Sequence, residues 1–317
     1  MELRPITADD LPVVHRLHRR AETFDNIPAV TSMDDLRSFI DGVQTTMATD
    51  TRLAEIGNAV VGYVHTFHLP SEVRLERCYV FGQVDPAHRR HGIGTELLRW
   101  GLERAENLLR SSGSSLPKFI RTDHYDFVDG PRQLFTSMGL KPVRFHDQMR
   151  RSLEVLPPAV ELDGIAIVPW PAERNAEVRE VKNVAFADHW GSTPTSPEFW
   201  EQMLSESTTR LDLSHIALTE TGDVVGYCLN DRFPTDDELL GRKEGWIGNL
   251  GTHPDYRGRG IATALINRSL QSFAAEGLTH ACLDVDSDSL TGARRLYETL
   301  GFVAQTSTIT YELQVAS

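Results

Sequence analysis

Apolar residues recur along two stretches of the chain at the spacing that places them on one face of an α-helix. One set is Leu98, Leu102, Ala105 and Leu109, and the other is Ala262, Ile266, Leu270 and Phe273. A glycine follows each set, Gly113 in the first stretch and Gly277 in the second. Because glycine commonly ends a helix, the pattern predicts two amphipathic helices that stop near these glycines.

Strand-like and helix-like runs surround each of these helices in the same order. The runs expected in the first half are residues 3–6, 33–43, 52–56, 59–67, 77–84, 118–123 and 132–138. Those expected in the second half are residues 165–168, 197–205, 216–219, 224–229, 246–252, 280–285 and 292–299. Strand, helix and strand in succession are typical of a βαβ unit. The predicted fold class is therefore α/β with a mixed sheet, in which a last strand closes each half.

The turn before each amphipathic helix is itself repeated. Asp85–Thr95 returns as His253–Thr263, and both copies contain the pattern Arg-x-x-Gly-x-Gly/Ala. Val60–Tyr63 likewise matches Val224–Tyr227. A repeat of about 165 residues is too long for a solenoid and has the size of a whole domain. We therefore predict a duplicated domain, with halves at residues 1–154 and 160–317 and a proline-containing linker between them.

Composition narrows the classes of partner. The formal net charge is −13, from 45 acidic and 32 basic residues, so we expect the protein to bind nucleic acid and anionic membranes poorly. Its three cysteines lie far apart without a Cys-x-x-Cys pattern, which favours buried thiols. No apolar run reaches the length of a membrane span, and the first residues do not resemble a signal peptide. We expect a cytoplasmic protein without a metal site, and its oligomeric state stays open.

The repeated turn has the properties of an anion site. The start of a helix presents unpaired backbone amides and the positive end of the helix dipole. Glycines let a bulky anion approach that backbone, and arginines add charge-assisted hydrogen bonds, so the turn suits a pyrophosphate. It lacks the Gly-Lys-Ser/Thr of a Walker loop. Gly258 and Gly260 also lack the third glycine of the dinucleotide fingerprint.

These motifs resemble the Gcn5-related N-acetyltransferase (GNAT) superfamily in a tandem, two-domain form. The resemblance rests on the turn Arg257–Ala262, the closing stretch Leu296–Phe302 and the first-half turn Arg89–Gly94. It covers nearly the whole chain and implies two acetyltransferase-type domains that use acetyl-coenzyme A (acetyl-CoA). The tandem layout, together with Phe186–Ser192, is similar to actinobacterial acetyltransferases of the mycothiol synthase type.

The resemblance also implies which residues contact the cosubstrate. Backbone groups at the end of the strand before the turn would bind the pantetheine arm and the acetyl group, with Gly251 allowing a β-bulge. The turn itself would hold the phosphates. The residues expected to bind are Leu250, Gly251, Thr252, Arg257, Gly258, Arg259, Gly260, Ile261, Ala262 and Thr263, and in the first half Gly82, Gln83, Val84, Arg90, His91, Gly92, Ile93, Gly94 and Thr95.

Tyr297 is the residue that the resemblance places in the chemistry. A phenol near the sulfur of CoA can protonate the leaving thiolate, since reference pKa values near 8.5 for a thiol and 10 for a phenol make this transfer workable. Phe135 stands at the equivalent position of the first half and cannot donate a proton. We therefore expect catalysis in the second half, and a degenerate first half whose CoA binding stays open. The family often has an asparagine before the closing helix, where this chain has Ser289 and Leu290.

The base and the acceptor are less sharply indicated. Glu244, at the start of the strand before the turn, is the first candidate for the base, with Glu76 as its first-half counterpart. Asp188 and His189 are alternatives. The acceptor is expected to be the amine of a small molecule, which could be a cysteinyl amine, as in mycothiol synthases, or a polyamine or aminoglycoside that suits the acidic charge. The rival from another class is a non-catalytic, CoA-binding regulatory protein.

Overall fold

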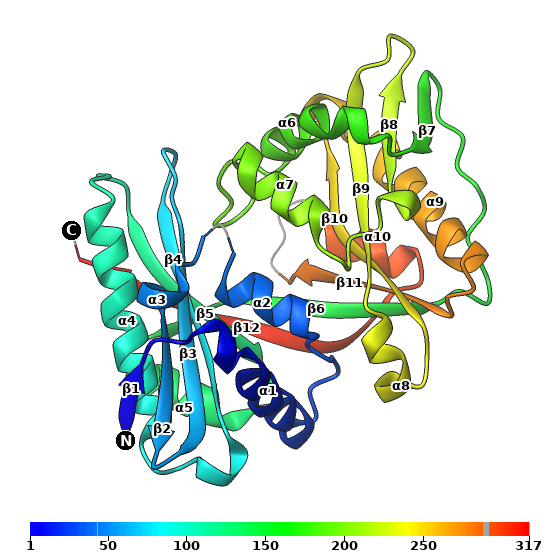
Figure 1. The fold of residues 1–317 in the computed structure, drawn as a ribbon. Coiled ribbons are helices and arrows are strands. Elements are labelled where there is room, and N and C mark those ends of the chain that lie inside the picture. Colours follow the sequence, from blue (N-terminus) through cyan, green and yellow to red (C-terminus); the bar gives the residue numbers. More distant parts are fainter. Residues whose placement is uncertain (43, 288–291, 317) are drawn as a thin grey trace. The chain divides into compact units, whose positions relative to one another are not determined.

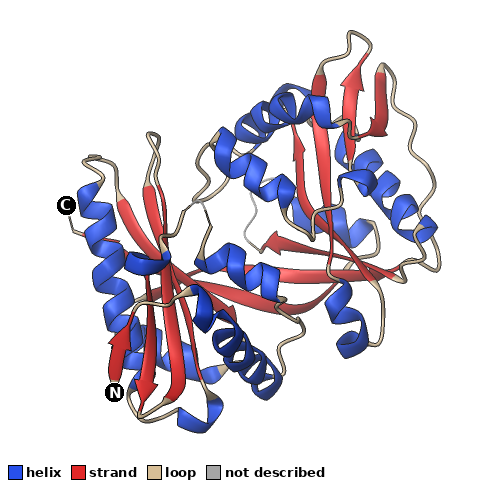
Figure 2. Ribbon diagram, viewed as in Figure 1, coloured by secondary structure: helices blue, strands red, loops and turns tan. Residues whose placement is uncertain are grey.

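The computed structural model describes residues 1–42, 44–287 and 292–316, and these form two compact units (Figure 1). Unit 1 consists of residues 1–145 and 308–317, and unit 2 of residues 146–307. Each unit is a mixed sheet with helices packed on it, as Figure 2 shows by colour. The α/β class predicted from the sequence is confirmed.

Unit 1 has the strand order β1-β2-β3-β4-β5-β12. Its strands are β1 (Glu2–Arg4), β2 (Thr51–Ile56), β3 (Ala59–Leu69), β4 (Glu76–Val84), β5 (Lys118–Tyr125) and residues 308–315 of β12 (Val303–Val315). Its helices are α1 (Leu11–Asp25), α2 (Met33–Ile40), α3 (Met47–Asp50), α4 (Ile93–Ser111) and α5 (Asp129–Ser137). The pair β4 and β5 is parallel and its neighbours are antiparallel, as expected where a helix connects two strands of one sheet.

Unit 2 repeats this arrangement with the order β7-β8-β9-β10-β11-β6. Its strands are residues 146–152 of β6 (Lys141–Ser152), β7 (Ile165–Pro169), β8 (His215–Thr219), β9 (Val224–Arg232), β10 (Glu244–Thr252) and β11 (His280–Asp286). Its helices are α6 (Asn175–Ala185), α7 (Pro197–Ser205), α8 (Asp237–Leu240), α9 (Ile261–Ala275) and α10 (Ala293–Thr299). The parallel pair is β10 with β11.

The last strand of each unit comes from the other half of the sequence. Residues 308–315 of β12 pair with Lys118–Tyr125 of unit 1, and residues 146–152 of β6 pair with His280–Asp286 of unit 2. The closing strand expected in each half is thus present but exchanged. The hydrophobic pattern does not show whether each closing strand pairs within its own half or with the other half. In both arrangements a similar strand occupies the same position in the sheet.

Helices cover both faces of the sheet in unit 2, and this decides which residues share a side. Leu265, Leu270 and Phe273 of α9 pack with Tyr297 of α10 on one face, here called the α9 face. Val178 of α6, Trp200 of α7 and the sheet residues Tyr227 and Leu229 pack together on the other, here called the α6 face. Cys78, Cys228 and Cys282 are buried free thiols, which confirms the expectation for the cysteines.

Candidate functional site

The two repeated turns have the same backbone. Gly260 is the N-cap of α9 with φ +81°, and Gly92 is the N-cap of α4 with φ +82°. The first hydrogen bond within α9 runs from the Ala264 amide to the Gly260 carbonyl oxygen, so the amides ahead of Ala264 have no partner inside the helix. These amides are available to an anion, as the sequence predicts for this turn.

The first arginine of each turn is already engaged. The Arg257 guanidinium donates to Asp188 at 2.9 Å and to the carbonyl oxygen of Ala185, at the end of α6, at 2.7 Å. Arg89 makes the matching pair with Asp25 of α1 at 2.6 Å. Each of these arginines therefore anchors the turn to a neighbouring helix. In unit 2 the second arginine, Arg259, stacks on the Tyr256 ring at 4.9 Å, on the exposed surface of the turn.

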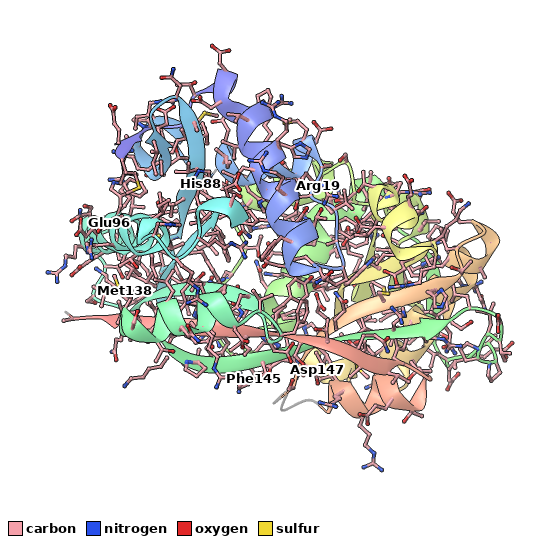
Figure 3. The ribbon with its side chains drawn as sticks, turned by 90° about the horizontal axis from the view of Figure 1, so that it is seen from below. Arg19, His88, Glu96, Met138, Phe145 and Asp147 are labelled. Atoms are coloured by element: carbon pink, nitrogen blue, oxygen red, sulfur yellow. The ribbon has the colours of Figure 1, made fainter. Side chains whose placement is uncertain are left out.

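Two features of the turn differ between the copies. Arg90 has φ +65° where the equivalent Gly258 has φ +76°, so unit 1 holds a side chain in a left-handed conformation that costs about 1 kcal/mol. Glu96 lies in the first turn of α4, where α9 has no acidic residue; Figure 3 labels Glu96 on this helix and His88 in the segment before it. A carboxylate near the helix start disfavours a bound anion, although Glu96 is paired with Arg99 at 2.6 Å, which offsets part of its charge.

A gap opens in the sheet of unit 2 before the chain reaches the turn. Within the described strands, the last register pair of β10 and β11 is Ile247 with Leu283, although β10 continues to Thr252. Beyond Ile247, the edge of β10 that faces β11 therefore presents backbone groups that no strand pairs. Such a gap, which leads directly into the turn, has the form expected for the slot of the pantetheine arm.

The β-bulge lies at Gly248 rather than at Gly251, so the expected position of the bulge was wrong. The register of β10 on β9 shifts between Ile247 and Asn249, whereas Gly251 pairs regularly with Tyr227. A Cβ at Gly251 would lie 2.5 Å from the ring of Tyr227, which explains the glycine there by close packing instead. The expected ligands Leu250, Gly251 and Thr252 all lie beyond the bulge, along the gap.

Unit 1 has a similar gap without a bulge. Register pairing of β4 with β5 ends at Tyr79, and Gly82, Gln83 and Val84 follow along the unpaired edge. The ladder between β4 and β3 runs from Leu69 to Gly62 without a register shift. The two copies therefore differ at the point where β10 is deformed.

Tyr297 lies on the α9 face at the level of the gap. It is 8% exposed and belongs to the same buried cluster as Cys228, the register partner of Leu250. Its ring packs edge-on against Phe302 at 6.0 Å. Burial raises the pKa of the Tyr297 phenol, with the nearby Cys228 as a smaller cause, so the phenol stays protonated at neutral pH. In unit 1, Phe135 packs against His124 and Tyr311 with centroid distances of 5.6 and 5.4 Å.

Two of the expected bases, Glu244 and Asp188, form ion pairs. Glu244 is buried at the first position of β10, where it is paired with Arg242 and lies 3.8 Å from Arg150. The hydrogen bond from Arg257 lowers the pKa of Asp188, which makes this carboxylate a weaker base. The alternative His189 packs against Phe186 with tilted rings, and Ser289 and Leu290 lie outside the described residues.

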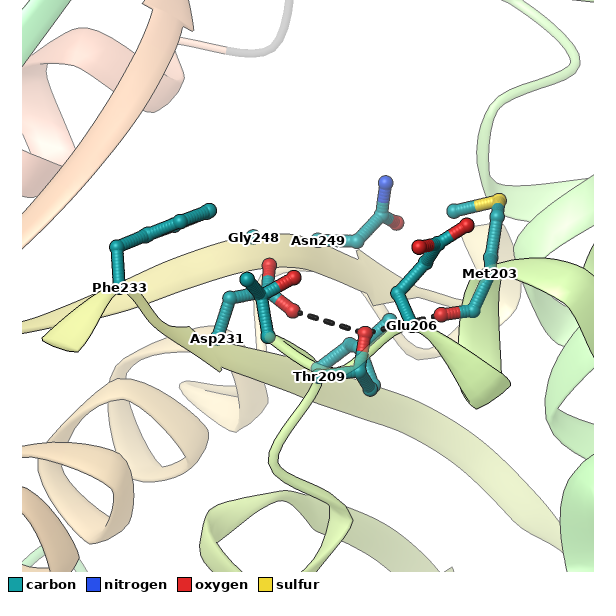
Figure 4. A pocket seen from close by; sticks show the side chains of 9 residues that line it. Met203, Glu206, Thr209, Asp231, Phe233, Gly248 and Asn249 are labelled. Carbon is teal, nitrogen blue, oxygen red and sulfur yellow. Dashed lines mark hydrogen bonds between the residues drawn. The ribbon is translucent and has the colours of Figure 1, made fainter. Parts of the chain in front are cut away.

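A pocket of about 180 Å³ opens on the α6 face beside the bulge (Figure 4). Its lining consists of Met203, Glu206, Thr208, Thr209, Leu229, Asp231, Phe233, Gly248 and Asn249. A Cβ built on Gly248 would lie 1.9 Å from Oδ2 of Asp231, so this carboxyl group lies directly over the backbone of the bulge. The Asn249 side chain accepts a hydrogen bond from the Tyr227 hydroxyl, which fixes the orientation of its amide.

Asp231 was missed by the sequence reasoning. Burial raises its pKa to about 6, and its hydrogen bond to Thr209, at 3.2 Å, only partly offsets that shift. The Thr209 hydroxyl also lies 2.9 Å from the Met203 carbonyl oxygen, and one hydroxyl proton cannot serve both acceptors. The available signal was an acidic residue in the polar end, Asn230–Arg232, of a strand that is apolar up to Leu229, but a single acid at a strand end is too common to stand out.

Two further properties follow from the described residues. No helix among them is long and apolar enough to cross a membrane. Within the same residues, no group of three or more His, Cys, Asp or Glu side chains is placed to hold a metal ion.

A family model matches both repeats of the chain. The model of the acetyltransferase (GNAT) family matches residues 15–113 and 176–302, one match in each repeat. Among solved structures, a GCN5-related N-acetyltransferase from Sphaerobacter thermophilus superposes with a TM-score of 0.76 at 25% identity, covering 100% of this chain and 96% of that one. A tandem GNAT protein from the clavulanic acid biosynthesis pathway gives 0.73 at 20% identity, with 100% and 99% coverage, and shares the fold.

Curated relatives extend over most of the chain. A mycothiol acetyltransferase of Sanguibacter keddieii is 28% identical over 96% of this chain and 94% of its own length. A mycothiol acetyltransferase of Streptomyces scabiei is 30% identical over 82% of this chain and 78% of its own length. The similarity therefore includes both repeats and is not confined to the turns.

Proposed function

Because the chain belongs to the GNAT family of acetyltransferases, and is an acetyl-CoA-dependent N-acetyltransferase, we propose that unit 2 carries the activity and acetylates an amine of a small molecule. One observation carries the assignment to unit 2. The gap between β10 and β11 starts at a β-bulge and leads into the turn at the start of α9. Phosphate-binding amides, an extended slot and a deformed strand edge thus follow one another along a single stretch of chain.

The residues of this stretch fit acetyl-CoA. Gly258 and Gly260 have positive φ angles, and a Cβ at Gly258 would meet nothing within 4 Å, so the turn is open to a bulky anion. The first turn of α9 holds no acidic residue that would repel phosphates. When bound, acetyl-CoA supplies an acetyl group activated as a thioester. The chain contributes the amides that hold the phosphates and Arg257, which anchors the turn.

Tyr297 is proposed as the acid. Its buried phenol remains protonated at neutral pH and lies on the α9 face at the level of Leu250. From there it can give a proton to the sulfur that leaves. Glu244 remains a predicted base. Its pairing with Arg242 and its closeness to Arg150 make its carboxylate a poorer proton acceptor.

Unit 1 is proposed as a non-catalytic copy. Phe135 replaces the phenol, β4 lacks the bulge, and Glu96 adds a negative charge at the start of α4. Its turn and gap remain similar enough that CoA binding by Arg90–Thr95 and Gly82–Val84 stays a prediction. The non-catalytic alternative for the whole protein would require unit 2 to have lost its chemistry as well, which the presence of Tyr297 disfavours.

The acceptor is proposed to carry a primary amine. Relatives named as mycothiol acetyltransferases favour a cysteinyl amine as one specific possibility, because the identity of 28% extends over both repeats. The acidic composition fits a cationic acceptor more generally.

The proposal is tested by calorimetric titration with acetyl-CoA, followed by release of free CoA thiol in the presence of added amines. The amines are 1,4-diaminobutane, cysteine methyl ester and glucosamine. We expect binding of acetyl-CoA and an amine-dependent release of thiol with at least one of the three. Absence of acetyl-CoA binding would refute the proposed function.

A further inference from the structure

The pocket beside the bulge places a buried carboxyl group at the mouth of the gap. Gly248 is the first residue of β10 beyond the last pair with β11, and Asp231 lies against its Cα. The closeness is possible because residue 248 has no side chain. Asp231 is therefore fixed next to the point where the slot for the acetyl group begins.

Asp231 and Tyr297 lie on opposite faces of the sheet of unit 2. Asp231 lines the same pocket as Leu229, which belongs to the cluster of the α6 face, whereas Tyr297 packs with α9. The neighbouring Asn230 donates to Ser269 of α9 at 2.8 Å, which confirms that the side chains alternate between faces here. A group held in the gap between β10 and β11 is thus approached from one face by Asp231 and from the other by Tyr297.

The neighbouring arginines form ion pairs with carboxylates other than Asp231. Arg232, next to it on β9, is paired with Asp237, and Arg210, on the segment that flanks β9, is paired with Asp212. Glu206, at the end of α7, lines the same pocket. On β10 the residue opposite Asp231 is the uncharged Trp246. A cation that enters the pocket would therefore meet an electrostatically favourable site.

We propose that Asp231 is the base that accepts a proton from the ammonium group of the acceptor, and that the end of the acceptor entering this pocket is a primary amine on an apolar methylene chain. The inference rests on the acetyl transfer proposed above and specifies its base and its acceptor. Met203, Leu229 and Phe233 supply the apolar walls, and a pocket of about 180 Å³ admits the amine-bearing end of an acceptor rather than a drug-sized molecule.

The protons balance as follows. The acceptor ammonium gives one proton to the Asp231 carboxylate and becomes an amine, whose nitrogen then bonds the acetyl carbon. The bond between that carbon and sulfur breaks, and the electron pair leaves with the sulfur. Tyr297 protonates the thiolate, and the second proton of the nitrogen restores Tyr297 through solvent. In total the nitrogen loses two protons, one of which ends on CoA and the other passes through Asp231 to solvent.

The first test compares Asp231→Asn with wild type, using acetyl-CoA and either 1,4-diaminobutane or glucosamine. The matched control is Asp223→Asn, an aspartate in the exposed turn at the far end of the same hairpin. Asp231→Asn is expected to lower kcat/KM for 1,4-diaminobutane at pH 8 by roughly 10²-fold or more, because a general base contributes 10²–10⁴ in rate. Its calorimetric Kd for acetyl-CoA should stay within about threefold of wild type.

The outcomes separate this inference from the proposed function. Wild-type protein that does not bind acetyl-CoA refutes the proposed function itself. Wild type that transfers acetyl groups to 1,4-diaminobutane, with Asp231→Asn equally active, overturns the role of Asp231. Acetyl-CoA binding followed by transfer only to glucosamine, or to neither amine, overturns the class of acceptor. If Glu244→Gln abolishes transfer while Asp231→Asn does not, the base is Glu244.

A second readout needs no acceptor. The folded-state pKa of Asp231, near 6, lies above the value of an exposed aspartate, so the folded state binds this proton more tightly than the unfolded state does. The resulting stability is present at low pH and is lost as the pH rises through about 6. Asp231→Asn should therefore raise Tm by several degrees at pH 8 and leave it unchanged at pH 4. If Asp231→Asn and wild type have the same Tm at pH 8 as well as at pH 4, the pKa of Asp231 is not raised in the folded state. That result would overturn its role as the base.

Discussion

At the scale of single residues, the proposed chemistry in unit 2 depends on two side chains whose pKa values are shifted in the same direction. Burial raises the pKa of both Tyr297 and Asp231. A raised pKa keeps the phenol protonated as an acid, while it brings the carboxyl closer to neutral pH, where a base is most effective. In the proposed mechanism, burial thus favours both the proton donor on the α9 face and the proton acceptor on the α6 face.

Tyr297→Phe is expected to lower turnover by roughly 10²-fold, because it removes the proton donor for the thiolate. The Kd for acetyl-CoA should change by less than about threefold, since a phenol that acts on the leaving group adds little to ground-state binding. The ring keeps its packing against Phe302, and Phe135 shows that unit 1 already accommodates phenylalanine at this position. Steady-state kinetics with calorimetry measure both effects. Unchanged turnover would remove Tyr297 from the mechanism.

At the scale of elements, the turns and helices were predictable and the details of the strand edge were not. The period of Ala262–Phe273 and the glycine after it predict α9, which the structure contains, and the repeated turn predicts an anion site. The bulge at Gly248 depends on how β10 lies on β9, and a glycine in a strand does not reveal whether it allows a bulge or the approach of a ring, as Gly251 does. Asp231 is a candidate because it lies against Gly248, and the order of residues along β9 does not reveal this contact.

Arg257→Ala is expected to loosen the turn from α6 and raise the Kd for acetyl-CoA roughly tenfold, which is about 1.4 kcal/mol. The Tm should change little, because an exposed ion pair such as Arg257 with Asp188 contributes at most about 1 kcal/mol to stability. Calorimetry and thermal unfolding separate the two quantities.

The matched control for this change is Arg89→Ala, which removes the equivalent pair with Asp25 from unit 1. It should leave amine-dependent turnover unchanged. If Arg257→Ala has no effect on Kd, its anchoring of the turn is unimportant for the cosubstrate.

At the scale of the whole molecule, exchange of the last strands makes the two units depend on each other for folding. Ile309, Tyr311 and Val315 of β12 are 1–7% exposed and belong to the core of unit 1. The repeat in the sequence predicts two domains of this type, and the structure gives two units, yet nothing in residues 303–315 specifies that they pair with β5. Which sheet a closing strand joins depends on the chain segments that connect it to its neighbours. The alternation of apolar and polar residues in the strand does not encode this choice.

A chain of residues 1–140 alone, which lacks both β12 and the similar strand β6, is therefore expected to fail to fold as a monomer. Losing three buried side chains of β12 removes roughly 6 kcal/mol, which is comparable to the whole stability of a small domain. Circular dichroism and thermal unfolding would detect this, and co-expression with residues 141–317 should restore the native signal. A cooperative thermal transition of the 1–140 fragment alone would show that β12 is dispensable for unit 1.

The central claim is that the acetyl transfer takes place in unit 2, and paired substitutions at equivalent N-caps test it most directly. Gly260→Glu and Gly92→Glu place the same charge at the same left-handed position of the two turns, with Gly260→Ala and Gly92→Ala as controls for backbone strain alone.

The measurement is amine-dependent release of CoA thiol by each variant. We predict that Gly260→Glu lowers the rate by at least roughly 10²-fold, because it puts negative charge where the pyrophosphate binds, while Gly92→Glu stays within about threefold of wild type. Loss of activity in Gly92→Glu with an active Gly260→Glu would contradict the account and assign the chemistry to unit 1.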